Sequence, residues 1–221
     1  MTTNHPYPRQ IQYQITPADY SALRTRLSAA AVEKGGAGTV HSLFFTSYRN
    51  RIPSHPIQEF HDGGERDARF ALHYFDNDPT YLMLERWLDQ ESTRAMVTEA
   101  ECRALLSGET DWLLDRRNPV LQDFHGCLTE QMLLPQVLLS YHREVYALDG
   151  LDLWVALDTD IHASLQHMDF LDPELLARDA LGQTGRILME ISYSDTIPDD
   201  LLCLLEETAP RRKLLGNRLL T

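Results

Sequence analysis

The sequence is poor in cysteine, has no long apolar run and contains fewer basic than acidic residues. No stretch approaches the roughly 20 apolar residues that a membrane-spanning helix needs, so we expect no membrane insertion. The polar segment 1–10 carries prolines and lacks the apolar core of a secretory signal. Its three cysteines, Cys102, Cys127 and Cys203, are far apart and lack metal-binding spacing. These absences predict a cytoplasmic protein with reduced thiols.

The charge balance narrows the choice of partner. The chain has 33 acidic and 20 basic residues, which gives a formal net charge of −13. Such a field repels nucleic acid and anionic membranes, and it opposes a polyanionic substrate unless a local basic site overcomes it. The P-loop, the dinucleotide-binding glycine pattern, the H-E-x-x-H zinc motif and the nucleophile elbow are also absent. Several common enzyme classes are thereby excluded.

What the sequence does contain is a series of short apolar segments along its whole length. Ile11, Tyr13 and Ile15 alternate with glutamines, which predicts a half-buried strand. Similar patterns predict further strands at 41–46, 69–75, 81–88, 137–143, 153–158 and 187–193. Turn residues at 76–79 join two of them, and the short connections favour antiparallel pairing.

Helix signals interrupt these strands. Thr16-Pro17 opens a first helix, which we expect to end at the glycines 35–36. A possible capping box at Thr98 and Glu101, followed by a second start signal at Asn118-Pro119, predicts a helical segment from about 93 to 134. The expected fold is α+β, in one domain over 1–221, with one curled or closed antiparallel sheet flanked by helices.

Several short motifs follow one another in a recognisable order. They are Ser42-Leu43-Phe44-Phe45-Thr46, Leu84-Glu85, Tyr141-His142-Arg143, and Glu190-Ile191-Ser192-Tyr193 with Pro198 shortly after. They resemble the S-L-Y-F-D, leucine-glutamate, Y-x-R and E-x-K-Y motifs of the VTC (polyphosphate polymerase) family. The resemblance covers roughly residues 9 to 220. On the basis of this resemblance, the chain is identified as a diverged member of the VTC branch of the triphosphate-tunnel, or CYTH-like, superfamily.

The resemblance implies a closed antiparallel tunnel whose inward basic side chains hold a nucleotide triphosphate or a polyphosphate chain. In the VTC branch the γ-phosphoryl group is transferred onto a growing polyphosphate. A glutamate near the last strand holds a divalent metal, Mn²⁺ or Mg²⁺. The resemblance thus points to Glu190 as the metal ligand and to four phosphate-binding residues, Arg66, Arg69, His73 and Arg143.

The residues themselves leave two alternatives open for the acidic positions. Glu190 and Asp158 are candidate metal ligands, but inward acids on strands also pair with arginines in buried ionic networks. Arg143 would then contact one of these acids rather than a phosphate.

The chain departs from the family pattern at several charged positions. Side chains two apart on a strand share a face, so a phosphate tunnel needs basic residues at alternate positions. In the strand 69–75 the inward face would carry Arg69, Ala71 and His73, where the family has three cations. Neutral residues replace charged ones elsewhere, at Gln10, Gln12, Trp154 and Ser192. Losing four cations costs roughly 6–12 kcal/mol of triphosphate binding, which is several orders of magnitude in affinity.

Two functions remain ahead of a third, a fully active polymerase, which ranks last because it would need basic residues that the alignment with the family lacks. The first is a VTC-like domain that binds a phosphorylated ligand in a tunnel, with polymerase activity weak or lost. The second is a non-catalytic interaction or scaffold protein that keeps the fold around a neutralised, filled cavity and uses its acidic surface for protein contacts. Convergence of Arg69, Arg143 and Glu190 on an open cavity favours the first. A cavity filled by Trp87 and Trp154 favours the second.

Overall fold

The structure, a computed structural model, describes most of the chain. The described residues are 9–47, 69–88, 91–148, 153–164, 170–172, 185–194, 196–197, 199, 201 and 213–214. Arg66 therefore lies outside them. Within these ranges, no helix has the length and apolar character that crossing a membrane would require.

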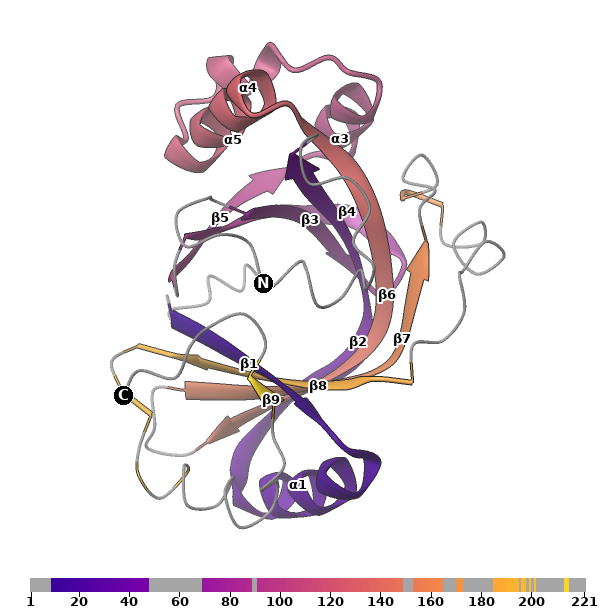
Figure 1. The fold of residues 1–221 in the computed structure, drawn as a ribbon, viewed down its shortest axis with the longest axis vertical. Helices are drawn as coiled ribbons and strands as arrows, with labels where there is room; N and C mark the ends of the chain where they lie inside the picture. The colour runs from indigo at the N-terminus through magenta and orange to yellow at the C-terminus, as the bar shows by residue number, and fades with distance from the viewer. Residues whose placement is uncertain are drawn as a thin grey trace.

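The described strands form one antiparallel sheet that closes on itself. They are β1 (Arg9–Ile15), β2 (Ala31–Ser47), β3 (Arg69–Phe75), β4 (Asp78–Leu88), β5 (Glu91–Val97), β6 (Leu133–Leu148), β7 (Leu153–Ser164), β8 (Ile187–Tyr193) and β9 (Lys213–Leu214). Their order is β5-β4-β3-β2-β6-β7-β8-β1-β9. A further pairing of β1 with β5, between Arg9 and Glu91, closes β1 to β8 into a barrel. Figure 1 shows the curl of the sheet, with the long strands β2 and β6 running through it.

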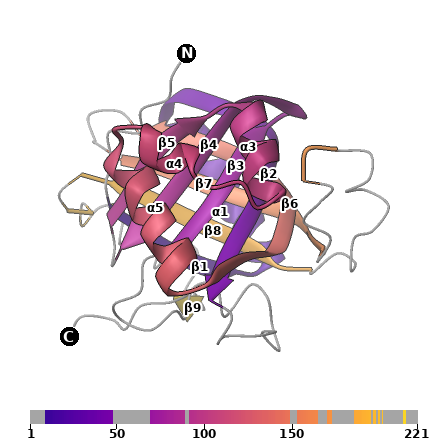
Figure 2. The ribbon, with the colours of Figure 1, turned by 90° about the horizontal axis from the view of Figure 1, so that it is seen from above.

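Helices cover two opposite sides of this barrel. Helices α3 (Glu99–Leu106), α4 (Trp112–Asp115) and α5 (Pro119–Glu130) lie together outside β3, β4 and β5, and α1 (Pro17–Ala30) lies on the opposite side (Figure 1). The view from above shows α3 and α5 crossing the strands that they cover (Figure 2). The expected α+β class, an antiparallel sheet closed into a tunnel with flanking helices, is confirmed.

Each group of helices buries a separate apolar core on the outer face of the sheet. The core under α3 to α5 includes Leu43, Phe70, Leu72, Tyr74 and Phe124. The core under α1 includes Leu23, Leu27, Tyr146, Val155 and Ile191. Because Phe70, Leu72 and Tyr74 face outward to the helices, the alternate residues of β3 face the barrel interior, as the strand pattern predicts.

The predicted helix starts are also confirmed. Thr98 Oγ1 accepts a hydrogen bond from the backbone N–H of Glu101 at 3.2 Å, and Thr98 N donates to Glu101 Oε2 at 2.8 Å, which is a complete capping box. Asn118 Oδ1 accepts from Val120 N at 2.9 Å, with Pro119 at the first helical position.

Several predicted boundaries are wrong. The segment predicted as helical from about 93 begins instead at Glu99, because residues 91–97 form β5. The first helix ends at Ala30 rather than at the glycines 35–36. These glycines lie within β2, where the pairing with β6 shifts register between Lys34 and Ala37 and Gly36 adopts a φ of 102°. Such irregularities are positions where glycine is favoured over other residues.

Candidate functional site inside the barrel

Polar and charged side chains from several strands meet on the inner face of the barrel. Strand alternation places them there, since their neighbours along each strand belong to the two outer cores. We call this set the interior network: Gln10, Gln12, Ser42, His73, Glu85, Arg94, Tyr141, Arg143, Asp158, Glu190 and Ser192.

Arg143 joins two carboxylates in this network. It lies opposite Asp158 across β6 and β7, and its Nε and Nη2 donate to Asp158 Oδ1 and Oδ2 at 2.7 and 2.8 Å. Nη2 also donates to Glu190 Oε2 at 3.3 Å. Burial alone would lower the pKa of Arg143, but Asp158 and Glu190 outweigh it and hold that pKa above its ordinary value. Two residues predicted for the site, Arg143 and Glu190, are thus brought together.

Glu190 has further hydrogen-bond donors besides Arg143. Gln12 Nε2 donates to its Oε2 at 2.8 Å, and Ser192 Oγ donates to its Oε1 at 3.4 Å. The pairing of acids with Arg143, one of the two alternatives for Glu190 and Asp158, is therefore the arrangement observed.

This arrangement does not fit a divalent metal ion. The guanidinium of Arg143 contacts oxygens of both Asp158 and Glu190, where a cation shared by these carboxylates would have to lie. Among the described residues, no three His, Cys, Asp or Glu side chains gather as a metal site. Mg²⁺ requires near-octahedral oxygen ligation. Metal binding by Glu190 stays a prediction, and it would require Arg143 to move.

A second ion pair lies on the opposite wall. Arg94 Nη2 donates to Glu85 Oε1 at 2.7 Å, and Gln10 Nε2 approaches the same oxygen at 3.3 Å. The Nε and Nη1 groups of Arg94 are buried and find no hydrogen-bond partner within the described part of the chain. Sequence reasoning missed Arg94 because it lay in the segment predicted as helical. The alternation of Ser92, Arg94 and Met96 was the available signal for an inward arginine on a strand.

His73 lies between the two ion pairs. Its Nδ1 is 2.7 Å from Ser42 Oγ, which is also 3.2 Å from the Tyr141 hydroxyl. Its Nε2 is 3.6 Å from Glu85 Oε2, too far for a hydrogen bond, and is buried without another partner among the described residues. Burial, reinforced by the nearby charges of Arg94 and Arg143, lowers the pKa of His73 to about 3. His73 is therefore a neutral hydrogen-bonding group at neutral pH and supplies no positive charge.

Apolar and aromatic side chains occupy part of the same interior. Phe44 and Trp87 stack with ring centroids 6.3 Å apart, and Trp87 meets His73 edge to face at 5.6 Å. Trp87 Nε1 donates to Gln10 Oε1 at 2.8 Å, which fixes its orientation. A buried apolar cluster packs against Phe44 and Tyr141 on this inner face: Val137, Leu139, Ile161, Ala163 and Leu188.

Arg69 and Trp154 also belong to the inner face by strand alternation. Arg69 is half-buried and lies opposite Trp87 in the pairing of β3 with β4. Trp154 is half-buried, shares its face of β7 with Asp158, and lies opposite Ser192 on β8. Of the predicted phosphate contacts, Arg143 and His73 thus belong to the interior network and Arg69 lies on the same face.

The charges on this inner face balance. Among the described residues of β3 to β8, three arginines face it (Arg69, Arg94 and Arg143), as do three carboxylates (Glu85, Asp158 and Glu190). His73 is neutral. The inner face of these strands therefore has polar groups suited to an anion but no excess of positive charge.

Comparison with known proteins places this geometry in a structural class. No protein-family description matches the sequence, and no curated protein matches it either. A solved structure from Hippeastrum, described as an adenylyl cyclase candidate with a dominant triphosphatase activity, is similar with a TM-score of 0.52 and 13% identity. The match covers 90% of this chain and 85% of that one. The chain has the CYTH-like triphosphate-tunnel fold.

A second solved structure of this kind is an adenylate cyclase candidate from Bacillus halodurans, with a TM-score of 0.49 and 12% identity. It covers 91% of this chain and 87% of that chain. At 13% identity, the likeness to the Hippeastrum structure establishes the fold and transfers no residue roles. Membership of the VTC branch stays a prediction.

Proposed function

We propose that this tunnel-fold protein binds a small phosphorylated ligand inside the barrel, at Arg94 and Arg143, and does not extend a polyphosphate chain. The fold supports phosphorylated compounds as the ligand class, by analogy with the triphosphatase activity described for the Hippeastrum protein. The size of the ligand and the lack of polymerisation follow from the residues themselves.

Arg94 carries this proposal. Only its Nη2 is hydrogen-bonded, while Nε and Nη1 are buried without a partner in the described part of the chain. A buried donor left unpaired costs about 1–3 kcal/mol, so a ligand that accepts from it gains that free energy. Phosphate oxygens match the forked donors of arginine. His73 Nε2 is likewise buried and unpaired among the described residues and can donate to a phosphate oxygen in one tautomer. Gln12 Oε1 is also unpaired there, but it only accepts and therefore suits a hydroxyl or amino group of the ligand.

The charge balance argues against a polymer. Each phosphate unit of polyphosphate adds negative charge, whereas the described arginines of the inner face are matched by carboxylates. One phosphate group can replace one carboxylate at one arginine. A chain of phosphates would bring its charges against Glu85, Asp158 and Glu190 without enough cations. Phosphoryl transfer also depends on stabilising that charge, so polymerase activity would be weak or lost.

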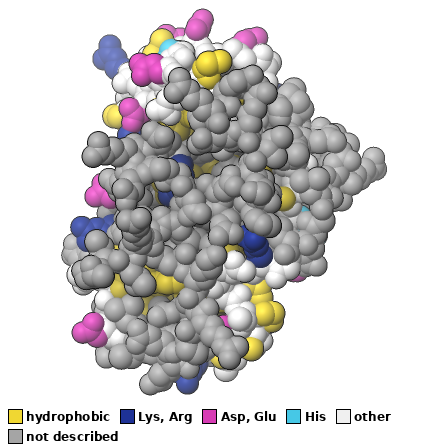
Figure 3. All heavy atoms as spheres, in the orientation of Figure 1, with side chains coloured by type: hydrophobic (Ala, Val, Ile, Leu, Met, Phe, Trp, Pro, Cys, Tyr) yellow, Lys and Arg dark blue, Asp and Glu magenta, His cyan; other side chains and the backbone are white. Residues whose placement is uncertain are grey.

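A second candidate function rests on the filled part of the interior. The stacked Phe44 and Trp87 and the adjacent apolar cluster around Val137 occupy space that a tunnel ligand would need. The protein would then be a non-catalytic scaffold whose acidic surface contacts other proteins. Figure 3 shows Asp and Glu side chains on the helix-covered end of the molecule, at the top of the view.

Thermal unfolding with a panel of ligands tests both candidates. The panel is inorganic phosphate, pyrophosphate, triphosphate, ATP and long-chain polyphosphate, each with and without Mn²⁺ or Mg²⁺. A ligand at a hundred times its dissociation constant adds about 2.7 kcal/mol, which raises Tm by roughly 5–11 °C in a domain of this size. We expect the short ligands to raise Tm and the polymer to add nothing further.

Two variants make this test specific. Arg94→Gln should abolish the shift, whereas Arg103→Gln, which changes an arginine of α3 with a 63% exposed side chain, should preserve it. The absence of any shift at millimolar concentrations would contradict ligand binding and leave the scaffold function.

A further inference from the structure

A serine on the outer face of the barrel lies between two histidines. In the paired strands β2, β6 and β7, Ser140 is directly opposite His41 on one side and His162 on the other. Leu43 and Leu138, two positions away on β2 and β6, belong to the outer core, and both chain neighbours of His162 belong to the inner apolar cluster. The three side chains therefore face outward. Ser140 and His162 are half-buried, so solvent reaches this row.

The imidazole of His41 is neutral and held in place. Burial lowers the pKa of His41 below its ordinary value of 6.5, and this outweighs the hydrogen bond to Asn77 and the charge of Asp76, which act in the opposite direction. The ring stacks on that of Tyr74, with centroids 4.7 Å apart and an angle of 27° between the planes. A neutral imidazole has one ring nitrogen that donates and one that accepts.

The hydrogen bonds of His41 show which nitrogen accepts. Its Nδ1 lies 2.7 Å from Ser140 Oγ, and its Nε2 lies 2.8 Å from Asn77 Oδ1. Because the amide oxygen of Asn77 can only accept, Nε2 carries the ring hydrogen and donates it. Nδ1 then has a free lone pair and accepts the hydrogen of the Ser140 hydroxyl. Asparagine, histidine and serine thus form one directed chain that ends at the serine oxygen.

The turn between β3 and β4 fixes Asn77 over His41. Asp76 N donates to Thr39 O, and Asp76 Oδ1 accepts from Thr39 N, both at 2.9 Å. A Cβ at Gly38 would collide with the Asp76 carboxylate, so a larger residue there would displace it from Thr39. Asn77 itself has a φ of 59°, which asparagine adopts more readily than most residues. The amide oxygen therefore reaches His41 from a turn that is anchored to β2.

We propose that Ser140 is a nucleophile that accepts an acyl group from a small carboxylic ester, with His41 as its general base and Asn77 as the residue that positions the base. Ser140 Oγ attacks the carbonyl carbon while its proton passes to His41 Nδ1. The bond to the alcohol oxygen then breaks, and the imidazolium returns the proton to that oxygen. The products are an acyl ester on Ser140 and the free alcohol. His162, directly opposite Ser140, is placed to donate a ring N–H to the carbonyl oxygen as it becomes negative.

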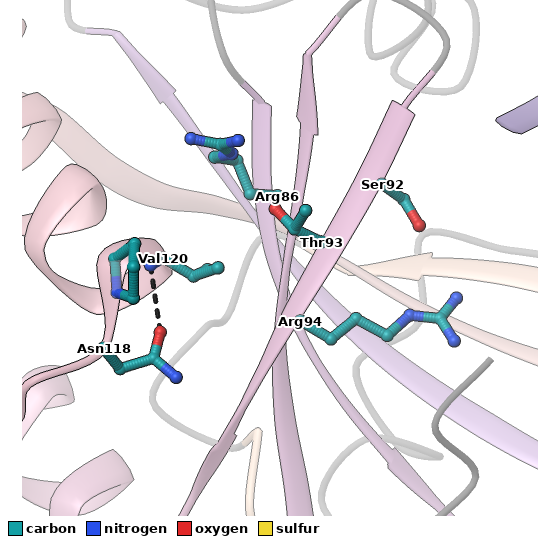
Figure 4. A pocket seen from close by; sticks show the side chains of 7 residues that line it. Arg86, Ser92, Thr93, Arg94, Asn118 and Val120 are labelled. Carbon is teal, nitrogen blue, oxygen red and sulfur yellow. Dashed lines mark hydrogen bonds between the residues drawn. The ribbon is translucent and has the colours of Figure 1, made fainter. Parts of the chain in front are cut away.

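This site is separate from the candidate ligand site. None of its residues belongs to the interior network. None lines the pocket of about 400 Å³ beside β5 either, where Arg94 and Ser92 extend to one side of the strand and Arg86 to the other (Figure 4). The reaction with an ester therefore does not depend on phosphate binding, and either proposal can fail without the other.

Two other serines show what distinguishes Ser140. Ser42 Oγ also lies 2.7 Å from a histidine Nδ1, that of His73, but Ser42 is 0% exposed inside the barrel. Ser107 is exposed at the end of α3, but its hydroxyl donates to the backbone carbonyl of Ala104. Ser140 combines a histidine base with the access from solvent that Ser42 lacks.

The acyl donor p-nitrophenyl acetate tests the proposal on the full chain. Release of p-nitrophenolate is followed with time, and peptide mass spectrometry locates the acetylated residue. The wild type should show a stoichiometric burst and carry the acetyl group on Ser140. Ser140→Ala should abolish the burst, whereas the control Ser107→Ala should preserve it. His41→Gln should slow the acetylation of Ser140 about a hundredfold or more, the range for a general base.

Two variants of Asn77 test the positioning role without relying on His41→Gln, which also removes a buried ring. Asn77→Gly suits the positive φ but removes the amide, and it should slow the acetylation of Ser140 roughly tenfold or more. Asn77→Asp keeps an acceptor oxygen and should restore the rate. The Tm of each variant, measured alongside, separates loss of the base from loss of the fold. Acetylation at other residues but not at Ser140, or equal rates of Ser140 acetylation in the wild type, His41→Gln and Asn77→Gly, would overturn the proposal.

Discussion

Arg143 and Asp158 face each other across β6 and β7 and are joined by two nearly parallel hydrogen bonds of 2.7 and 2.8 Å. The side chain of Arg143 is 20% exposed and that of Asp158 is 5% exposed. A bidentate pair at this depth holds two adjacent strands in register and places the guanidinium beside Glu190. A phosphate ligand at Arg143 must therefore compete with Asp158 for the guanidinium.

Breaking this pair on one side should destabilise the protein strongly. Asp158→Leu leaves Arg143 with Glu190 as its ionic partner among the described residues and should cost about 3–5 kcal/mol. The double variant Arg143→Met with Asp158→Leu removes both charges and should recover much of that loss. Urea unfolding of the two single variants and the double variant measures the coupling. Single variants within about 0.5 kcal/mol of wild type would contradict a structural role for the pair.

His73 should make the protein sensitive to acid. Its pKa is about 3 in the folded state, lowered by burial and by Arg94 and Arg143, against 6.5 as the ordinary value. Between these two values the unfolded chain binds a proton at this residue and the folded chain does not. The stability that neutral His73 contributes is thus complete above pH 6.5 and is lost progressively as the pH falls toward 3.

The comparison of wild type with His73→Gln isolates this contribution. The free energy of unfolding of the wild type should fall relative to that of the variant by up to about 1.4 kcal/mol per pH unit below pH 6. Denaturant unfolding at several pH values measures the difference in slope, which does not depend on how far the variant is destabilised overall. Parallel curves for the two proteins would show that His73 is accessible to protons in the folded state.

Thr98 offers a local test of the helix that covers β4. Thr98→Ala removes the side-chain half of the capping box with Glu101 and should cost about 1 kcal/mol. The matched control is Thr129→Ala on α5, where the hydroxyl donates to the backbone carbonyls of His125 and Gly126 and caps no N–H group. Equal losses in the two variants, measured by chemical unfolding, would show that the capping box contributes nothing specific.

The sequence predicted those parts of the fold whose signals are local. The capping box at Thr98, the Asn118-Pro119 helix start and the outward face of β3 each depend on residues a few positions apart. The turn at Asp76 and Asn77 is similar, because both residues adopt positive φ values of 50° and 59°, which Asp and Asn tolerate well. Closure of the barrel by Arg9 and Glu91 depends on a pairing between residues far apart in the sequence, and no local pattern predicts it.

The candidate site was predictable only in part, for a related reason. Arg143, Glu190 and His73 were found through a family resemblance and the alternation of strands. Arg94 was missed because β5 places polar residues inward and has few apolar residues, so the segment from about 93 was predicted as helical. The ion pairs that neutralise these residues join strands distant in sequence, and strand pairing alone brings them together.

The charge balance of the interior can be tested by restoring the missing cations. Trp154 and Ser192 lie opposite each other on β7 and β8, on the inner face, where the resemblance to the VTC family implies basic residues. The double variant Trp154→Arg with Ser192→Lys should raise the affinity for triphosphate about ten- to a hundredfold for each cation that contacts a phosphate. Because Glu190 lies beside Ser192 and will compete for the new charge, we expect the lower end of this range.

A surface control distinguishes a direct contact between a new cation and a phosphate from a general change in the protein's electrostatic field. Gln122→Lys with Thr129→Lys adds two cations to exposed positions of α5 and should change the affinity for triphosphate little, since exposed charges are screened by salt. Isothermal titration with triphosphate at two ionic strengths compares the proteins. If the affinity for triphosphate rises in the interior variant but not in the surface variant, then lost cations, rather than the filled apolar part of the barrel, limit binding. If the interior variant binds triphosphate no more tightly than the wild type, then Phe44, Trp87 and the apolar cluster limit binding, because added positive charge does not compensate for the space that they occupy.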